Sequence, residues 1–261
     1  MVKKMVVAGV LCFTLLAAVR SFAEPPQVNA WELGIGVSGF TYDEPGLMKE
    51  EGVLVGLKAS YAHRRKLMLK AEAEIGFGTV SYDGSTWGGD PVTADGGDYK
   101  WELRGLVGYD FVKGTVLLTP YTGIAYRYLN DQLSGVGAYE RESNYYYSPI
   151  GLEINKEFAN GWSWNTTLEY DIFWNGLQVS HLSDVDPGLN DIKNDQTDGY
   201  GYRISMKFQN KNGFGIEPYY RYWDIKQSDP AIVTYEGTPV GIGVEPKNNS
   251  REIGIMFSKK F

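Results

Sequence analysis

Apolar residues alternate with polar or small ones over most of this chain, and this period of two constrains the fold more than any other feature. In 67–77 the odd positions carry Leu, Leu, Ala, Ala, Ile and Phe, whereas the even positions carry Met, Lys, Glu, Glu and Gly. Segments 99–111, 200–208 and 253–261 repeat the pattern. Because successive side chains of a β-strand point to opposite faces, the pattern predicts strands with one apolar face.

Ten such strands are predicted, and each is long enough to cross a bilayer, which takes about 9–11 tilted residues. Tight turns follow the second, fourth, sixth and eighth strands, and long polar loops are predicted at about 83–97, 131–143, 181–196 and 228–247. Short turns at one end and long loops at the other are typical of outer-membrane barrels. The strands are expected at 31–43, 51–63, 66–82, 98–112, 115–130, 144–158, 161–180, 197–210, 213–227 and 248–261.

The composition excludes several other classes of protein. A mean hydropathy of −0.30 excludes a polytopic helical membrane protein, whose spans each need about 20 apolar residues. Aromatic residues make up 14% of the chain, which is too many for a disordered protein, and 32 glycines disfavour a mainly helical one. A net charge of −7 argues against a nucleic-acid partner, because such proteins present a basic face.

Alternation alone does not separate a membrane barrel from a soluble β-sandwich, because both have one apolar face per strand. Three further features favour the barrel. The segments exceed the five or six residues usual in soluble sheets, and the last strand ends on Phe261. Tyr and Trp gather at strand ends, as in an interfacial girdle. We therefore predict an all-β fold, namely a transmembrane up-and-down antiparallel β-barrel of ten strands.

The first 23 residues have the pattern of a secretory signal peptide. Two lysines precede an apolar run of about 15 residues, and a small-x-small cleavage site ends at Ala23. This predicts a signal peptide at 1–23 and one barrel domain at 24–261. Cleavage would remove Cys12, the only cysteine, so the exported chain is expected to lack disulfides and cysteine metal ligands.

The signal peptide, the alternating strands and the terminal Phe together resemble the ten-stranded outer-membrane β-barrel proteins of Gram-negative bacteria, within the porin-like and OmpA-like superfamily. This resemblance implies an outer-membrane location, contact with membrane lipid and lipopolysaccharide, and recognition of the C-terminal strand by the assembly machinery. Phe257 and Phe261 match that assembly signal, whereas Lys259 occupies a position that is usually apolar. Such barrels include proteases, adhesins and lipid-modifying enzymes, so the resemblance selects no activity.

If the apolar face meets lipid, the charged face lines the lumen. Buried charges are tolerated only when they are paired and hydrogen-bonded. Ten strands enclose little more than an eight-stranded barrel, which side chains fill, whereas open porins use about 16–18 strands. We therefore predict a lumen filled by ion pairs, with a conducting lumen as the alternative. The predicted network comprises Glu72, Glu74, Glu102, Arg104, Arg127, Glu153, Glu169, Asp171, Arg203, Lys207, Glu217 and Arg221.

Candidate chemistry is sparse, and no catalytic, metal-binding or cofactor-binding residue is assigned. The weak candidates are His181, Ser183 and Asp195, because a His-x-Ser pair with a nearby carboxylate can activate a serine for acyl transfer. The pair resembles the His-x-Ser of outer-membrane lipid A deacylases, although the surrounding residues differ. An omptin-like protease would need an aspartate where Val179 stands. Solvated rim residues are the competing interpretation.

Two predicted loops are acidic, and carboxylate clusters can bind Ca²⁺ or bridge to lipopolysaccharide through divalent ions. The loop at 184–188 lacks the spacing of an EF-hand, so a solvated loop is the simpler expectation and no metal site is assigned. The clusters are Asp184, Asp186, Asp191 and Asp195 in one loop, and Asp90, Asp95 and Asp98 in the other.

The sequence thus supports three functional hypotheses. The first is a non-enzymatic structural or surface-interaction protein with a filled lumen. The second is a small channel for ions or solutes. The third is a hydrolase that acts on lipid A or peptides at the outer rim.

Overall fold

The structure is a computed structural model that describes residues 28–85, 89–135 and 137–261. The predicted signal peptide at 1–23 lies outside these residues. No helix in the described part of the chain has the length and hydropathy of a membrane span.

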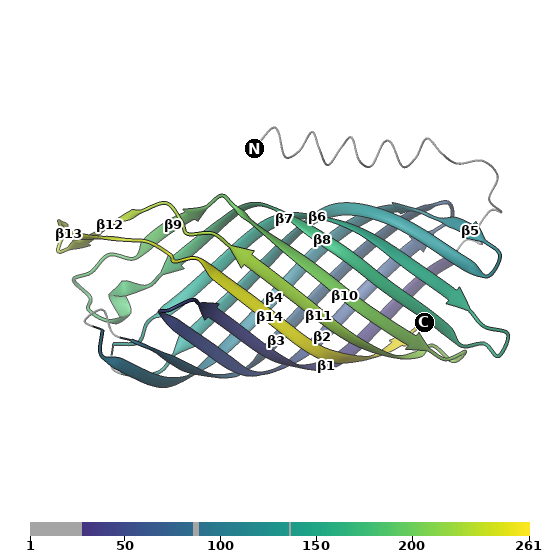
Figure 1. The fold of residues 1–261 in the computed structure, drawn as a ribbon, viewed down its shortest axis with the longest axis horizontal. Helices are drawn as coiled ribbons and strands as arrows, with labels where there is room; N and C mark the ends of the chain where they lie inside the picture. Colours follow the sequence, from purple (N-terminus) through teal and green to yellow (C-terminus); the bar gives the residue numbers. More distant parts are fainter. Residues whose placement is uncertain (1–27, 86–88, 136) are drawn as a thin grey trace.

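Ten long antiparallel strands close into a barrel (Figure 1), as the alternation predicts. Each strand pairs with its sequence neighbours in an up-and-down order, and the ring is closed by β8 with β10 and by β1 with β14. The barrel strands are β1 (Val28–Glu44), β2 (Met48–Arg64), β3 (Leu67–Ser85), β4 (Pro91–Tyr109), β6 (Val116–Leu133), β7 (Glu140–Glu157), β8 (Ser163–Ser180), β10 (Gly199–Gln209), β11 (Phe214–Ile225) and β14 (Asn248–Lys260).

The first and last strands form a continuous ladder. Ile35 lies opposite Phe257 and Val37 opposite Ile255, and the backbones of Trp31 and Phe261 exchange hydrogen bonds at the end of the ladder. The barrel wall therefore has no open edge along these strands, so no row of backbone groups is left unpaired.

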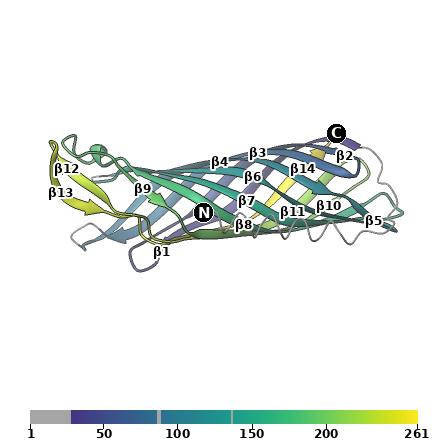
Figure 2. The same ribbon diagram turned by 90° about the horizontal axis from the view of Figure 1, so that it is seen from above.

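The two ends of the barrel differ. Tight turns lie at the end that we call the turn end, where Gly114, Gly161 and Gly213 adopt φ values of 63°, 79° and 84°. These positive values favour glycine, which has no Cβ to clash. The longer connections lie at the opposite end, the loop end, where a two-stranded hairpin projects beyond the barrel wall (Figure 2).

The loop end contains more regular structure than expected. The 181–196 segment holds the 3₁₀ turn η1 (Leu182–Asp184) and strand β9 (Ile192–Gln196), and the 228–247 segment forms a hairpin of β12 (Ala231–Tyr235) and β13 (Thr238–Gly243). Both segments lie at the loop end as predicted, but no strand was predicted in them; Leu182, Ile192 and Val233 form a small buried apolar cluster that joins the two segments.

The loop predicted at 83–97 is likewise mostly strand. The β3–β4 ladder continues as far as the pair Ser85 and Pro91. A further short strand, β5 (Phe111–Lys113), continues the line of β4 and pairs with β6. The β3–β4 ladder therefore extends further toward the loop end than the predicted strands 66–82 and 98–112, whereas β5 lies almost wholly within the predicted 98–112.

The distribution of side chains is the reverse of that in a soluble protein. Large apolar side chains stand exposed on the outside, among them Phe77 at 54%, Leu103 at 52% and Ile253 at 68%. Charged side chains such as Glu102 and Arg203 point inward and are buried. This arrangement is stable where hydrocarbon covers the outside, because lipid solvates the apolar band.

A cysteine pair tests barrel closure. In a chain with Cys12→Ser, the double variant Ile35→Cys/Phe257→Cys should form an intramolecular disulfide, since opposite residues of an antiparallel pair have Cα atoms about 4.5–5.5 Å apart. Mass spectrometry of unreduced peptides should detect the link. The pair Ile35→Cys/Phe77→Cys, on β1 and β3 with β2 between them, should form none. A disulfide in the second pair and not the first would contradict the strand order.

Candidate functional site

The lumen brings charged residues from opposite walls into contact. Arg203 of β10 donates hydrogen bonds to both carboxylate oxygens of Glu102 of β4, at 2.7 and 2.6 Å, and to Asp171 at 3.2 Å. Strands β6, β7 and β8 lie between β4 and β10 on the shorter way round the barrel. The Arg203–Glu102 hydrogen bonds therefore cross the lumen, whereas the bond to Asp171 joins β10 to its neighbour β8.

A second group crosses the lumen between β11 and β3. Arg221 donates to both oxygens of Glu74, at 2.5 and 2.6 Å. Lys100 of β4 pairs with Glu252 of β14, which also accepts hydrogen bonds from Ser38 at 2.9 Å and Tyr219 at 2.8 Å. Charges from strands that share no ladder are thus neutralised at the middle of the barrel.

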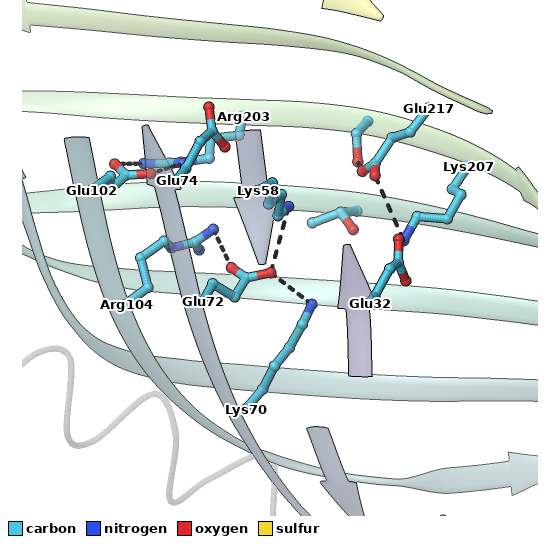
Figure 3. A network of polar contacts seen from close by, with 12 residues as sticks. Glu32, Lys58, Lys70, Glu72, Glu74, Glu102, Arg104, Arg203, Lys207 and Glu217 are labelled. Carbon is cyan, nitrogen blue, oxygen red and sulfur yellow. Dashed lines mark hydrogen bonds and ion pairs between the residues drawn. The ribbon is translucent and has the colours of Figure 1, made fainter. Parts of the chain in front are cut away.

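Glu72 is the centre of a third group, nearer the turn end (Figure 3). Its carboxylate lies 2.8 Å from the guanidinium of Arg104, 3.0 Å from the Lys70 amine and 3.5 Å from the Lys58 amine. Lys70 also reaches Glu153 on β7 at 3.0 Å. The negative charge of Glu72 thus offsets the repulsion among the positive charges of Arg104, Lys70 and Lys58.

A polar cavity of about 150 Å³ lies among these groups. Lys207 stands at its wall, 2.6 Å from Glu32 and 3.6 Å from Glu217 (Figure 3). A cavity of this size has room for ordered water molecules, because one water needs about 10–15 Å³ by this measure.

Of the twelve residues in the predicted lumen network, the structure brings eleven into ion pairs. Arg127 differs: its guanidinium stacks over the rings of Tyr145 and Trp223, at 5.4 and 5.9 Å, and its Nη2 lies 3.5 Å from the hydroxyl of Ser250. The paired residues are Glu72, Glu74, Glu102, Arg104, Glu153, Glu169, Asp171, Arg203, Lys207, Glu217 and Arg221.

The sequence reasoning missed the ion-pair group nearest the loop end. Arg141 of β7 donates to Glu44 at 2.9 Å, to Glu50 at 2.9 Å and to Asp131 at 2.7 Å. The predicted loop 131–143 includes Arg141, because the polar run 140–144 shows no apolar alternation, but β7 begins at Glu140. Glu44 lies on β1, across the barrel from β7, so this group spans the lumen below the loops.

Aromatic side chains fill the space between these ionic groups. Tyr145, Tyr147, Phe173 and Trp223 form one buried cluster with Ile225. The Tyr147 ring packs edge-on against Trp223, with centroids 4.9 Å apart, and its hydroxyl donates to Glu102 at 2.6 Å. The loop half of the lumen is therefore packed with both apolar and ionic side chains.

His181 lies at the rim between two carboxylates. Its Nδ1 is 3.2 Å from Asp191 and its Nε2 is 3.2 Å from Glu142. Partial burial lowers the pKa of His181, but the hydrogen bonds with Glu142 and Asp191 outweigh it, and the net pKa lies above its ordinary value of 6.5. Glu140, Glu142 and His181 are half-buried and each offer one possible metal-ligand atom, and these atoms lie within 4.8 Å of one another.

The predicted trio His181, Ser183 and Asp195 does not assemble. The Ser183 hydroxyl donates to Asp191 at 2.7 Å and not to the imidazole. Asp195 lies in β9 opposite Leu177, and its carbonyl oxygen accepts a hydrogen bond from the Asp229 amide. Serine activation needs an imidazole nitrogen that accepts the serine proton, and both nitrogens of His181 face carboxylates instead.

The acidic loop cluster predicted from Asp90, Asp95 and Asp98 also does not form as one group. The side chain of Asp98 on β4 faces the lumen and is 3% exposed. Asp95 is exposed, and its carboxylate accepts a hydrogen bond from the Ser81 hydroxyl. The prediction failed because Asp98 shares the inward face of β4 with Lys100 and Glu102, whereas Asp95 lies on the opposite, exposed face.

Comparisons with known proteins agree with this architecture. The family model described as autotransporter beta-domain matches residues 31–177, more than half of the chain. The outer-membrane protease OmpT from Escherichia coli is similar over 94% of this chain and 99% of its own, with a TM-score of 0.65 and 10% identity. At that identity the likeness shows the fold alone.

Two autotransporter structures show weaker similarity. The match with the translocator domain of NalP from Neisseria meningitidis covers 98% of this chain and 95% of that domain, with a TM-score of 0.41 and 12% identity. The match with the β-domain of the Bordetella autotransporter BrkA covers 88% of this chain and 99% of that domain, with a TM-score of 0.42 and 11% identity. Among curated protein sequences, none matches this chain.

Removing one cross-lumen cation should destabilise the barrel. Arg203→Met leaves Glu102, Glu169 and Asp171 buried without their shared cation, and breaking such a buried pair costs about 3–5 kcal/mol. Urea unfolding in detergent micelles should show this loss, whereas Arg251→Met, at an exposed position on β14, should change stability by less than about 0.5 kcal/mol. Equal effects of the two substitutions would contradict a lumen held by ion pairs.

Proposed function

The chain belongs to the autotransporter β-domain family and is an outer-membrane β-barrel, and from its interior we propose that it is a non-enzymatic, non-conducting surface protein that displays its loop end outside the cell. The proposal includes export by residues 1–23 with cleavage near Ala23, assembly through the strand that carries Phe257 and Phe261, and contact with membrane lipid and lipopolysaccharide.

The observation that carries the proposal is the set of ion pairs that span the lumen. Arg141 reaches from β7 to Glu44 of β1, and Arg203 reaches from β10 to Glu102 of β4. A water path through the barrel would have to separate these charges. Leaving one buried charge without its partner costs several kcal/mol, so the closed arrangement is favoured.

A small channel is the second candidate. The polar cavity near the turn end favours it, because Lys58, Lys70 and Lys207 line a space that holds water-sized groups. However, the Arg203, Arg221 and Arg141 groups lie between this cavity and the loop end. The cavity is therefore best explained as a hydrated interior pocket.

The surface role is supported by the projecting hairpin. Ile232 of β12 and Ile242 of β13 lie directly opposite each other and are 62% and 73% exposed, while Val240 beside them is 60% exposed. The other face of the hairpin packs Val233 against Leu182. An exposed apolar patch on a rigid element is typical of a protein-contact surface, so we propose that this hairpin contacts a partner protein.

Planar bilayer recordings separate the first two candidates. Purified protein should insert without producing conductance steps, because the lumen side chains block an ion path. Protection of the barrel strands from added protease shows that insertion has occurred. Stable, reproducible steps in the wild type would refute the closed-barrel proposal.

Photocrosslinking tests the contact surface. Benzoylphenylalanine at the position of Ile242 should form covalent adducts with protein in the cells that naturally make this chain. The same probe at Val233, which faces the inside of the hairpin, should form none. Adducts with lipopolysaccharide alone at position 242 would contradict a protein partner.

A further inference from the structure

Three carboxylates converge inside the barrel at its loop end. Glu50 of β2, Asp98 of β4 and Asp131 of β6 each offer an oxygen, and these oxygens lie within 4.8 Å of one another. Their side chains are 1%, 3% and 4% exposed. They come from three separate strands, so the tertiary fold alone creates this group.

The group carries more negative charge than its surroundings neutralise. Arg141 forms ion pairs with Glu50, Asp131 and Glu44. Within the described residues, the ion pairs of this group all involve that one guanidinium, and Arg127 stacks on aromatic rings instead.

Asp98 supplies an independent indication of a missing ligand. Both of its carboxylate oxygens are buried and have no hydrogen-bond partner among the described residues, and one oxygen of Asp131 is in the same state. Buried polar groups normally have partners, because an unpaired buried carboxylate is costly. The side chain is directed toward Glu50 and Asp131, where only a cation or a proton would compensate it.

We propose that Glu50, Asp98 and Asp131 bind one divalent cation of the calcium type at the loop end of the lumen. Carboxylate oxygens are hard ligands that suit Ca²⁺ and Mg²⁺, and the group contains no histidine or cysteine that would favour zinc. Ca²⁺ accepts 6–8 oxygens in flexible geometry. It therefore fits an irregular set of side chains from three strands better than Mg²⁺, which requires near-ideal octahedral ligands.

The cation would join β2, β4 and β6 just below the long connections. It would do so together with Arg141, which already joins β7 to β1 and β2. The bound ion would stabilise the displayed end of the barrel whether or not the hairpin contacts a partner, so its test is independent of the proposed surface role.

Calcium binding should be measured on full-length protein refolded into detergent without lipopolysaccharide, which itself binds divalent ions. Equilibrium dialysis with radioactive Ca²⁺ should find one ion per chain. Asp98→Asn should weaken the affinity by at least about tenfold, since loss of even an outer partner of a metal site costs 10–100-fold. Glu51→Gln is the matched control, because Glu51 neighbours Glu50 but its side chain is 60% exposed.

Thermal unfolding by circular dichroism provides a second readout. Ca²⁺ should raise the melting temperature of the wild type and of Glu51→Gln but not that of Asp98→Asn, and the heat-dependent shift of barrels on gels shows that each variant is folded. The proposal is overturned if the wild type binds no Ca²⁺ at about 10 mM, above the usual range for extracellular sites. It is also overturned if Asp98→Asn binds as the wild type does.

A shared proton is the competing explanation for the three carboxylates. In that case Ca²⁺ changes nothing, and Asp98→Asn stabilises the protein in the presence of a chelator, because it removes a carboxyl that has no partner. That pair of results would also overturn the cation site.

Discussion

The ladder between β1 and β14 is the interaction on which the rest of the structure depends. In hydrocarbon no water satisfies an exposed backbone group, so a sheet is stable there only when it closes on itself. Closure in turn separates the chain into two environments, because side chains that alternate along each strand must face either lipid or the enclosed lumen. Ile35 and Phe257 face outward from this ladder, whereas Ser38 and Glu252 face each other inside it.

The enclosed charges explain why this barrel has one arrangement of strands. A buried ion pair adds little net stability compared with well-packed apolar residues, because both charges lose their hydration. The ion pairs instead select the strand register: a slip of one residue in β4 would turn Glu102 toward lipid and remove it from Arg203, which would keep only Glu169 and Asp171 of the neighbouring β8. Since Arg203, Arg221 and Arg141 each reach a strand that is not their neighbour, every pair constrains the register of several ladders at once.

Period-two alternation was sufficient to predict the ten strands and their order of turns and loops, and it placed Glu102 and Arg203 on the inward face, but it missed the inward charges around Arg141. It could not predict partners such as Arg203 and Glu102, which depend on strand tilt and on the reach of side chains across the lumen. It also missed β12 and β13. A run as short as 231–235 within a polar segment does not indicate a strand, and the contact that orders it, Val233 with Leu182, depends on the tertiary fold. Asp98 was grouped with the loop residues Asp90 and Asp95, yet it stands at the start of the predicted strand 98–112 and shares the buried inward face with Lys100 and Glu102.

The lumen is not uniform along its axis, and this difference has a physical consequence. Near the turn end, Glu72 and Glu153 have several cationic neighbours beside a polar cavity that has room for water, so each carboxylate there is paired. Toward the loop end, aromatic rings around Trp223 exclude water, and the carboxylates beyond them outnumber the guanidinium of Arg141. A low-dielectric layer strengthens both attraction and repulsion between charges. The same packing that closes the barrel therefore makes the acidic group at its loop end the part that most needs a compensating cation.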